Sequence, residues 1–311
     1  MSDARIRSKE SQHHQRKMEK TKNLDVTRIA KCALSMAVFA SSLLTRFVCR
    51  LVGRTPGGSC VVLYYHSILP CQRTRFARQL DLLRRHARPF DVTGAVELER
   101  GVDYVGVTFD DAFENFVDQA LPELKKRKIP ATMFVISGAL GKGFGPAGSM
   151  EKVMSVEQLC CLPTDLVTIG SHTASHPFMP GISEEDARRE LLESKATLER
   201  LLNCEIATFS FPFGGFSPRL IEICRETGYR RVFTTLPVFA FAEDPDEFAV
   251  GRVRVDPTDW FVEFRLKLAG AYRWLPLAFA LKRRFLGRAN PAAGVLQPTA
   301  SRSMIREWSG Q

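Results

Sequence analysis

The sequence has few histidines, and its C-terminal third has none. Six histidines occur among 311 residues, and no histidine follows His176. Two of the three that come after Cys71 are His172 and His176, which stand four residues apart. Any site that uses an imidazole besides those of His172 and His176 must therefore take it from the part of the chain before them.

Cysteine motifs and nucleic-acid signatures are also missing. The eight cysteines include no CxxC pair, and several lie in apolar stretches, where cysteine behaves as a small hydrophobic residue. An even count in a chain of this size is little evidence for disulfides, so a reducing compartment suits these thiols best. There is no helix-turn-helix or zinc-finger signature and no aromatic and basic pattern of a single-strand binder. We therefore expect no nucleic-acid partner.

Long uninterrupted apolar runs are absent as well. The apolar segment 29–52 contains three basic residues, and its longest uncharged stretch has 14 residues. A helix that crosses a bilayer needs roughly 20 apolar residues. We therefore interpret residues 29–55 as an apolar or amphipathic helix that lies on a membrane surface. A short signal anchor and a buried helix covering the main domain are the alternatives, so the expected localisation is cytoplasmic or membrane-associated.

Positive charge is concentrated at the two ends of the chain. The formal net charge is +10; residues 1–31 hold nine Lys and Arg against four acids, and residues 264–288 hold seven and no acid. Such ends suit anionic partners such as an acidic membrane surface or a phosphorylated glycan carrier. We predict a disordered basic tail over residues 1–28 and a basic amphipathic helix with a tail over residues 271–311. For the second segment, a solvated helix packed on the main domain is the alternative.

Between these ends, short β-branched or aromatic runs alternate with segments of helical period. This pattern is typical of repeated βα units and a parallel sheet. The candidate strands are 60–65, 104–109, 131–136, 166–170, 206–211, 231–234 and 248–254, and the candidate helices are 74–88, 112–127, 183–202, 217–227 and one or two within 259–288. Strands in this order favour a barrel, and the pattern alone leaves an open doubly wound sheet as the alternative.

The strongest local signal is a strand that ends in two carboxylates, Val107-Thr108-Phe109-Asp110-Asp111. Ligands of parallel α/β folds gather at the carboxyl ends of strands. Because neighbouring side chains of an extended chain point in opposite directions, Asp110 and Asp111 can have different tasks. One can bind a metal while the other activates water. A helix N-cap pair before Ala112 is the structural alternative.

The second signal is His172-Thr173-Ala174-Ser175-His176, which also follows a candidate strand. Two imidazoles four residues apart reach the same point if the segment makes a helical turn, which Pro177 would end. With Asp111 they make a two-histidine, one-carboxylate set that suits Zn²⁺ or another divalent cation. Such a cation makes water more acidic and polarises a carbonyl group, with Asp110 as the general base. Surface or capping histidines are the alternative.

The third signal is Phe209-Ser210-Phe211-Pro212-Phe213-Gly214-Gly215, a strand end that passes into a Pro/Gly turn. Here Pro212, Phe213 and Gly214 can supply a backbone N–H group for an oxyanion and an apolar wall for a sugar ring. An ordinary strand-to-loop turn explains the same residues.

Together, these segments resemble the polysaccharide deacetylases with the NodB homology domain, carbohydrate esterase family four. The family's Thr-Phe-Asp-Asp, His-Ser/Thr-x-x-His and Pro-aromatic-Gly motifs correspond to residues 108–111, 172–176 and 212–214. The resemblance implies an α/β fold, a distorted (β/α)7-type barrel over residues 56–270 with N- and C-terminal helical extensions. It also implies Asp110 as the catalytic base and Asp111, His172 and His176 as metal ligands.

The sequence departs from the family's pattern in two places. Many members begin the third motif with an arginine that holds the catalytic base, and Ser210 stands in that region here, so Arg252 or Arg254 are the candidate replacements. Many members also carry a C-terminal Leu-x-His whose imidazole is the general acid, and this chain lacks it. Asp256 opens an Asp-x-x-Asp-Trp string without that histidine and is a further candidate for support.

The missing imidazole has a candidate near the start of the barrel. The segment Val62-Leu63-Tyr64-Tyr65-His66-Ser67 is similar to the first strand of family members acting on poly-N-acetylglucosamine, which implies His66 as the general acid. A histidine that caps the strand is the structural alternative. We predict a metal-dependent hydrolase that deacetylates N-acetylated sugars of a polysaccharide or lipid-linked glycan. A noncatalytic glycan-binding protein, a deacylase of another ester or amide, and a membrane-surface scaffold are the alternatives.

Overall fold

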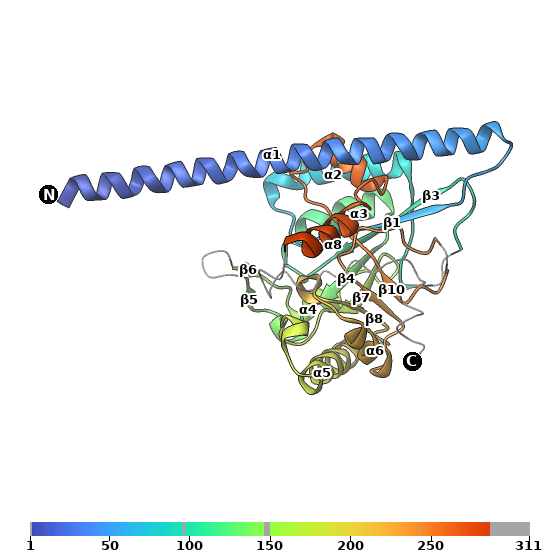
Figure 1. The fold of residues 1–311 in the computed structure, drawn as a ribbon. Helices are drawn as coiled ribbons and strands as arrows, with labels where there is room; N and C mark the ends of the chain where they lie inside the picture. Colours follow the sequence, from blue (N-terminus) through green and yellow to red (C-terminus); the bar gives the residue numbers. More distant parts are fainter. Residues whose placement is uncertain (1, 95–96, 146–149, 243, 287–311) are drawn as a thin grey trace.

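The computed structural model describes residues 2–94, 97–145, 150–242 and 244–286 (Figure 1). The strands are β1 Ser59–Tyr65, β2 Arg88–Pro89, β3 Asp103–Phe109, β4 Ala131–Val135, β5 Gly143–Phe144, β6 Glu151–Lys152, β7 Val167–Ser171, β8 Thr208–Ser210, β9 Arg231–Phe233, β10 Ala249–Val250 and β11 Val253–Arg254. The helices are α1 Ser2–Leu51, α2 Arg73–His86, α3 Leu121–Arg127, α4 Val156–Cys160, α5 Glu184–Leu202, α6 Pro218–Glu226, α7 Phe261–Leu268 and α8 Leu275–Leu286.

The central strands are buried on both faces. In β1 and β3, every residue after the first is buried, and all five residues of β4 are buried. Helices cover the outside of the sheet (Figure 1), and side chains from both layers form one large apolar core. Continuous apolar runs are typical of parallel strands that are covered in this way.

The sheet curls into a barrel. In the described part of the chain its strands pair in parallel in the order β10-β9-β8-β7-β4-β3-β1-β11, with β2 beside β3. From β1 to β10 the strands follow one another in chain order, whereas a doubly wound sheet reverses direction at an inner strand. This confirms the predicted (β/α) barrel.

The two ends of the strand path are joined by a short crossing. Val250 pairs with Phe233 at one end, and Val253 pairs with Leu63 at the other. Three residues of extended chain span at most about 11 Å. The two edges therefore lie close together, and the crossing between β10 and β11 nearly closes the barrel. The single strand predicted over 248–254 is wrong, because the chain changes neighbours inside it.

Two predicted helices differ from the structure in a way that shapes the site. The helix expected over 112–127 begins only at Phe116, with a π-helical turn that leads into α3. Residues 111–114 are instead a loop, and Phe113 makes an isolated bridge to Val153. The N-cap interpretation of the aspartate pair is therefore wrong. By contrast, the helix predicted over 183–202 matches α5, which begins with a Ser183 cap whose hydroxyl accepts a hydrogen bond from the Asp186 N–H group.

Helix α1 runs along one side of the domain and extends beyond it at its N-terminal end (Figure 1). The structure differs here from the disordered tail predicted over residues 1–28, since residues 2–28 continue the helix of the apolar segment. Lys, Arg, Glu and Gln are good helix formers, so they extend an existing helix at little cost. Residues 26–51 are long and apolar enough to cross a membrane by length and composition, and 11% of that window is buried. The tail predicted beyond residue 288 lies outside the described residues.

Candidate active site and metal centre

The predicted site residues come from loops at the carboxyl ends of neighbouring strands. The backbone N–H group of Asp110 donates to the Tyr65 carbonyl at 2.9 Å, and that of His172 donates to the Val135 carbonyl at 2.9 Å. Both residues are therefore still fixed by the ladder of the sheet. Since parallel strands end at the same edge, His66, which follows β1, lies at this edge too.

Asp110 is buried and forms a two-point ion pair with Arg252. Arg252 Nη1 donates to Oδ1 at 2.8 Å and Nη2 donates to Oδ2 at 2.9 Å. Burial alone would raise the pKa of Asp110, but the guanidinium, together with His172, outweighs it and lowers the pKa to about 2. Asp110 is thus held as a carboxylate in a fixed orientation.

Arg252 lies in the crossing between β10 and β11 and is fully buried. Its remaining donors reach the hydroxyl groups of Thr108 and Ser210, at 3.0 and 2.6 Å, and the Thr234 carbonyl at 3.3 Å. The guanidinium carbon lies 4.6 Å from the centre of the Tyr64 ring. These contacts satisfy a buried cation that would otherwise be costly. Of the two arginines predicted from sequence as candidates for holding Asp110, Arg252 is therefore the one in contact with it.

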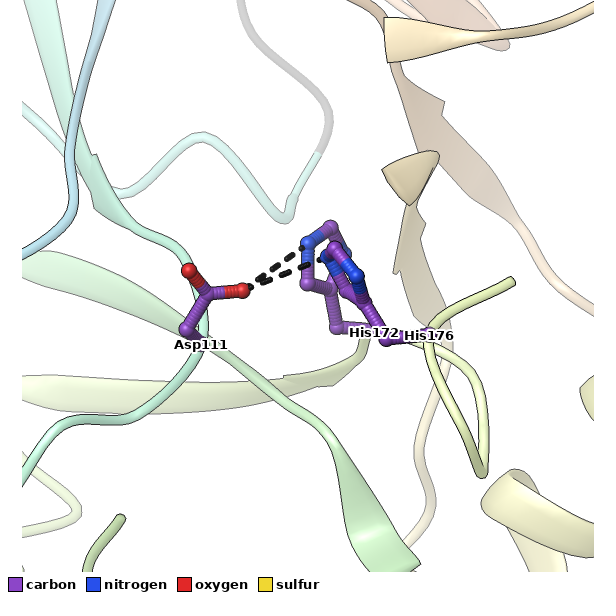
Figure 2. A group of neighbouring side chains, drawn as sticks. All are labelled: Asp111, His172 and His176. Atoms are coloured by element: carbon purple, nitrogen blue, oxygen red, sulfur yellow. Dashed lines mark ion pairs between the residues drawn. The ribbon is translucent and has the colours of Figure 1, made fainter. Parts of the chain in front are cut away.

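Asp111, His172 and His176 converge on one point (Figure 2). Asp111 Oδ1 lies 3.5 Å from His172 Nε2 and 3.4 Å from His176 Nε2. One donor atom from each residue lies within 4.8 Å of the other two. Two segments 60 residues apart in the chain thus bring their predicted ligands together at contact distance.

The hydrogen bond on the far side of His172 determines which ring nitrogen is free. Nδ1 lies 2.8 Å from the Ser210 carbonyl, which can only accept, so Nδ1 carries the proton. Nε2 then has a lone pair that faces Asp111 (Figure 2). This is the arrangement by which a backbone carbonyl orients a metal-binding histidine.

The three residues fit a divalent cation. Asp111 Oδ1 is buried and has no hydrogen-bond partner among the described residues. Burial, with Asp110 and Glu151 nearby, raises the pKa of Asp111 to about 8, and burial lowers the pKa of His172 to about 4. Two neutral imidazoles beside an unpartnered carboxylate oxygen are the ligand chemistry that Zn²⁺ and other late divalent cations take.

The loop that carries the two histidines is not the predicted helical turn. Thr173 and His176 both have positive φ, 68° and 62°, so the backbone reverses instead of coiling. Glu190 of α5 holds the loop: its Oε2 accepts hydrogen bonds from the N–H groups of Ala174 and Ser175, at 2.9 and 2.8 Å. The prediction of convergence was right in outcome, but its backbone path was wrong.

Backbone strain is concentrated at the site. Of the eight non-glycine residues with positive φ in the described chain, five belong to its loops. They are Asp111, Ala112, Thr173, His176 and Phe213. Such conformations cost about 1–3 kcal/mol each and persist where the surrounding structure enforces them. The site loops are therefore held in shape by their packing.

The third motif forms a tight turn beside His176. The Phe213 ring is 70% exposed, and its centre lies 4.6 Å from that of the His176 ring. The N–H groups of Gly214 and Gly215 are used within the turn, where they donate to Phe211 and Pro212. Gly214 has a φ of 66°, and a Cβ atom there would lie 1.9 Å from Thr235 Oγ1. Only glycine fits this turn, and Phe213 offers an apolar surface next to His176.

His66 lines a cavity of about 220 Å³ together with Glu151, Arg254 and Asp256. Burial lowers its pKa, an effect that Asp110 partly opposes. Arg254 is exposed and points into this cavity instead of binding Asp110. The Asp256 carboxylate accepts hydrogen bonds from Thr258, which fixes the turn after β11. Of the two arginines considered from sequence, the structure thus brings Arg252 to Asp110 and leaves Arg254 at the cavity wall.

Several residues at the site were not predicted from sequence. Glu151 of the β5–β6 hairpin is close enough to Asp111 to raise its pKa, and it shares hydrogen bonds with Ser67 and Asn115. Asn115 Nδ2 also donates to Ser67 Oγ at 2.7 Å. Nothing in the local sequence marks Glu151 or Glu190, because both act through contacts between distant segments.

Comparison with known proteins agrees with this geometry. The profile of the family described as "Polysaccharide deacetylase" matches residues 98–232. The protein YxkH of Bacillus subtilis (strain 168) is 28% identical over 151 residues, which is 49% of this chain and 51% of that protein. A poly-beta-1,6-N-acetyl-D-glucosamine N-deacetylase of Staphylococcus aureus (strain MRSA252) is 24% identical over 162 residues, 49% of this chain and 54% of that protein. The chain thus spans about half the length of the curated relatives it matches.

A solved structure extends the match to most of the domain. IcaB from Ammonifex degensii is 30% identical, with a TM-score of 0.60, and the alignment covers 70% of this chain and 98% of that one. The strand order, the three motifs and this coverage agree with one another. The chain belongs to the polysaccharide deacetylase family.

Proposed function

We propose that this protein is a metal-dependent hydrolase that deacetylates N-acetylated sugars of a glycan, with residues 56–270 as its catalytic domain. The observation that carries the proposal is the buried contact of Asp111 with two neutral imidazoles, with the Asp110–Arg252 pair beside it. The S. aureus relative is named as an N-deacetylase of a poly-N-acetylglucosamine, which supports the substrate class. A polysaccharide or a lipid-linked glycan has the same reacting group.

Asp111, His172 and His176 would hold the cation, and Zn²⁺ fits this ligand set best. When bound, it supplies positive charge that makes a nearby water more acidic and polarises the acetyl carbonyl. The Ser210 carbonyl keeps the His172 ring in the tautomer that this task needs. Phe144 and Phe213 contact the His176 ring and limit the access of bulk water to it.

Asp110 is the general base in this proposal. Arg252 occupies one lone pair on each of its oxygens, so each oxygen has a second lone pair for the proton of the attacking water. The Phe213 N–H group is the proposed donor to the oxyanion that forms on the acetyl group. His66, at the wall of the cavity, is the proposed donor of a proton to the departing sugar amine. Arg254, Asp256 and Glu151 line the same cavity and would contact the glycan.

Two substitutions test the proposal by separate readouts. We expect Asp110→Asn to lose acetate release from N-acetylglucosamine oligomers while zinc stays bound, because it removes the base and leaves the ligands. His172→Ala should instead lose zinc, as measured by elemental analysis of the purified protein. The control is Asp165→Asn at an exposed aspartate, which should keep both activity and metal. Full activity in either site variant would contradict the mechanism.

The alternatives predict different results in the same assays. A noncatalytic glycan-binding protein would bind the oligomers without releasing acetate from them. A deacylase of another substrate would release acid faster from an acetate ester or another amide than from an N-acetylated sugar, because the chemistry of the site depends little on what lies beyond the carbonyl. Acetate release that is confined to N-acetylated sugars would separate the proposal from both.

A further inference from the structure

Helix α1 turns most of its large apolar side chains to solvent and mainly small or polar side chains to the domain. Ile29, Leu34, Met36, Leu44, Phe47 and Leu51 are each between 46% and 69% exposed. The small residues Cys32 and Ser35, in contrast, are buried against the domain, where Cys32 and the half-buried Phe39 belong to a small apolar cluster. A helix that packs on a soluble core has the opposite arrangement, with its apolar stripe facing inward. The apolar side of α1 is therefore not part of the core of this domain.

Specific polar contacts hold the inner side of α1 from the middle of the helix onward. Arg28 Nε donates to Glu263 of α7 at 2.6 Å, and its guanidinium carbon lies 4.3 Å from the centre of the Trp260 ring. Two turns further on, Ser35 Oγ accepts a hydrogen bond from Trp274 Nε1 at 2.9 Å.

The same side is also held toward its C-terminal end. Arg273 Nη2 donates to Ser42 Oγ at 2.8 Å, and Arg46 Nη1 donates to Asp103 Oδ2 at 2.7 Å. From Arg28 to Arg46 a helix is roughly 27 Å long. Contacts over this length keep the helix axis against the domain, so the docked helix cannot also cross a bilayer of about 30 Å.

We infer that α1 is an in-plane membrane anchor, docked on the domain by its inner side of mainly small and polar residues and buried in the lipid by its exposed apolar side. The occupant we assign to the exposed side is a lipid bilayer, because the window 26–51 is apolar enough to lie within one. Arg50 and Arg54 are exposed near the end of the helix, where they suit anionic headgroups. Phe261 and Val262 of α7, the helix that contacts α1, are also exposed, at 70% and 51%.

Flotation of the full-length protein with vesicles of phosphatidylethanolamine and phosphatidylglycerol tests the anchor. We expect the Leu44→Glu/Val48→Glu variant to bind about tenfold or more weakly, since two exposed apolar side chains are replaced by charges. The matched control is Leu192→Glu on α5, a residue 50% exposed on a helix at the opposite end of the domain (Figure 1). It should float like the unchanged protein. Equal flotation of the unchanged protein and the double variant would overturn the inference.

Two further readouts separate lipid binding in the plane from other arrangements. An in-plane helix keeps both of its ends on the side of the domain, so protease added outside should remove an N-terminal tag from all vesicle-bound protein. A tag that stays protected would mean that the helix crosses the bilayer and would overturn the inference. Protein that does not float and sediments as a dimer, which Leu44→Glu/Val48→Glu converts to a monomer, would instead assign the apolar side to a second copy of the chain.

Discussion

Removing the Arg252 side chain is the most informative perturbation of this protein, because it changes stability and the candidate base together. In Arg252→Ala the Asp110 carboxylate loses both of its charged hydrogen bonds and stays buried. Thr108 and Ser210 lose a partner as well. Breaking a buried ion pair from one side costs about 3–5 kcal/mol.

That loss is a large part of the stability of a single domain, which is about 5–15 kcal/mol. For a domain of this size it corresponds to a decrease in Tm of roughly 6–20 °C. Without the guanidinium, burial is the dominant influence on Asp110 and raises its pKa, so the residue tends to become protonated. We therefore expect acetate release to fall even at temperatures where the variant is folded.

Urea unfolding followed by circular dichroism measures the effect, with Arg254→Ala as the control two residues away. Arg254 is exposed, so its removal should change the free energy of unfolding by about 0.5 kcal/mol or less. The double variant Asp110→Asn/Arg252→Met should regain most of the stability that Arg252→Ala loses, because no buried charge is then left without a partner. If Arg252→Ala unfolded within about 0.5 kcal/mol of Arg254→Ala, the reasoning about the buried pair would be refuted.

Three further predictions concern the turns, a helix end and the metal. Gly214→Ala should cost about 2–3 kcal/mol because its Cβ atom would clash with Thr235. Gly228 has the same sign of φ but open space around it, so Gly228→Ala should cost only about 1 kcal/mol. Thermal unfolding compares the two variants, and equal losses of stability would contradict the clash. Ser183→Ala should cost about 1 kcal/mol through the lost cap of α5, and an unchanged Tm would argue against that cap. Chelation with EDTA should lower Tm, because a bound ligand at about 100 times its Kd adds about 2.7 kcal/mol to the free energy of unfolding. A wild-type Tm that EDTA does not change, or an equal change in His172→Ala, would contradict a metal at this site.

Much of the barrel is predictable from sequence because its strands are buried on both faces. The apolar runs at 60–65, 104–109 and 131–136 match β1, β3 and β4 within a residue. The run 248–254 misled the prediction, since one apolar run can belong to two strands with different neighbours. The local sequence does not reveal that Val250 is hydrogen-bonded beside β9 whereas Val253, three residues later, is hydrogen-bonded beside β1.

The same limit applies to the site. The four-residue spacing of His172 and His176 is compatible with a helical turn and with the reversed loop that the structure has, because spacing alone does not determine the path of the backbone. Arg252 and Arg254 could not be ranked either, since residues two apart in a strand face the same side. The choice depends on the crossing between β10 and β11, which is a property of the whole barrel.

The position of Arg252 in that crossing means that the Asp110–Arg252 pair depends on a late part of the chain. During synthesis the N-terminal strands leave the ribosome first, so β1 to β9 can form before the two edges of the sheet are joined. Asp110 can pair with Arg252 only after β10 and β11 have been added and join the two sheet edges. A chain that still lacks Arg252 would therefore be without the crossing that joins the two sheet edges and without the partner of the Asp110 carboxylate.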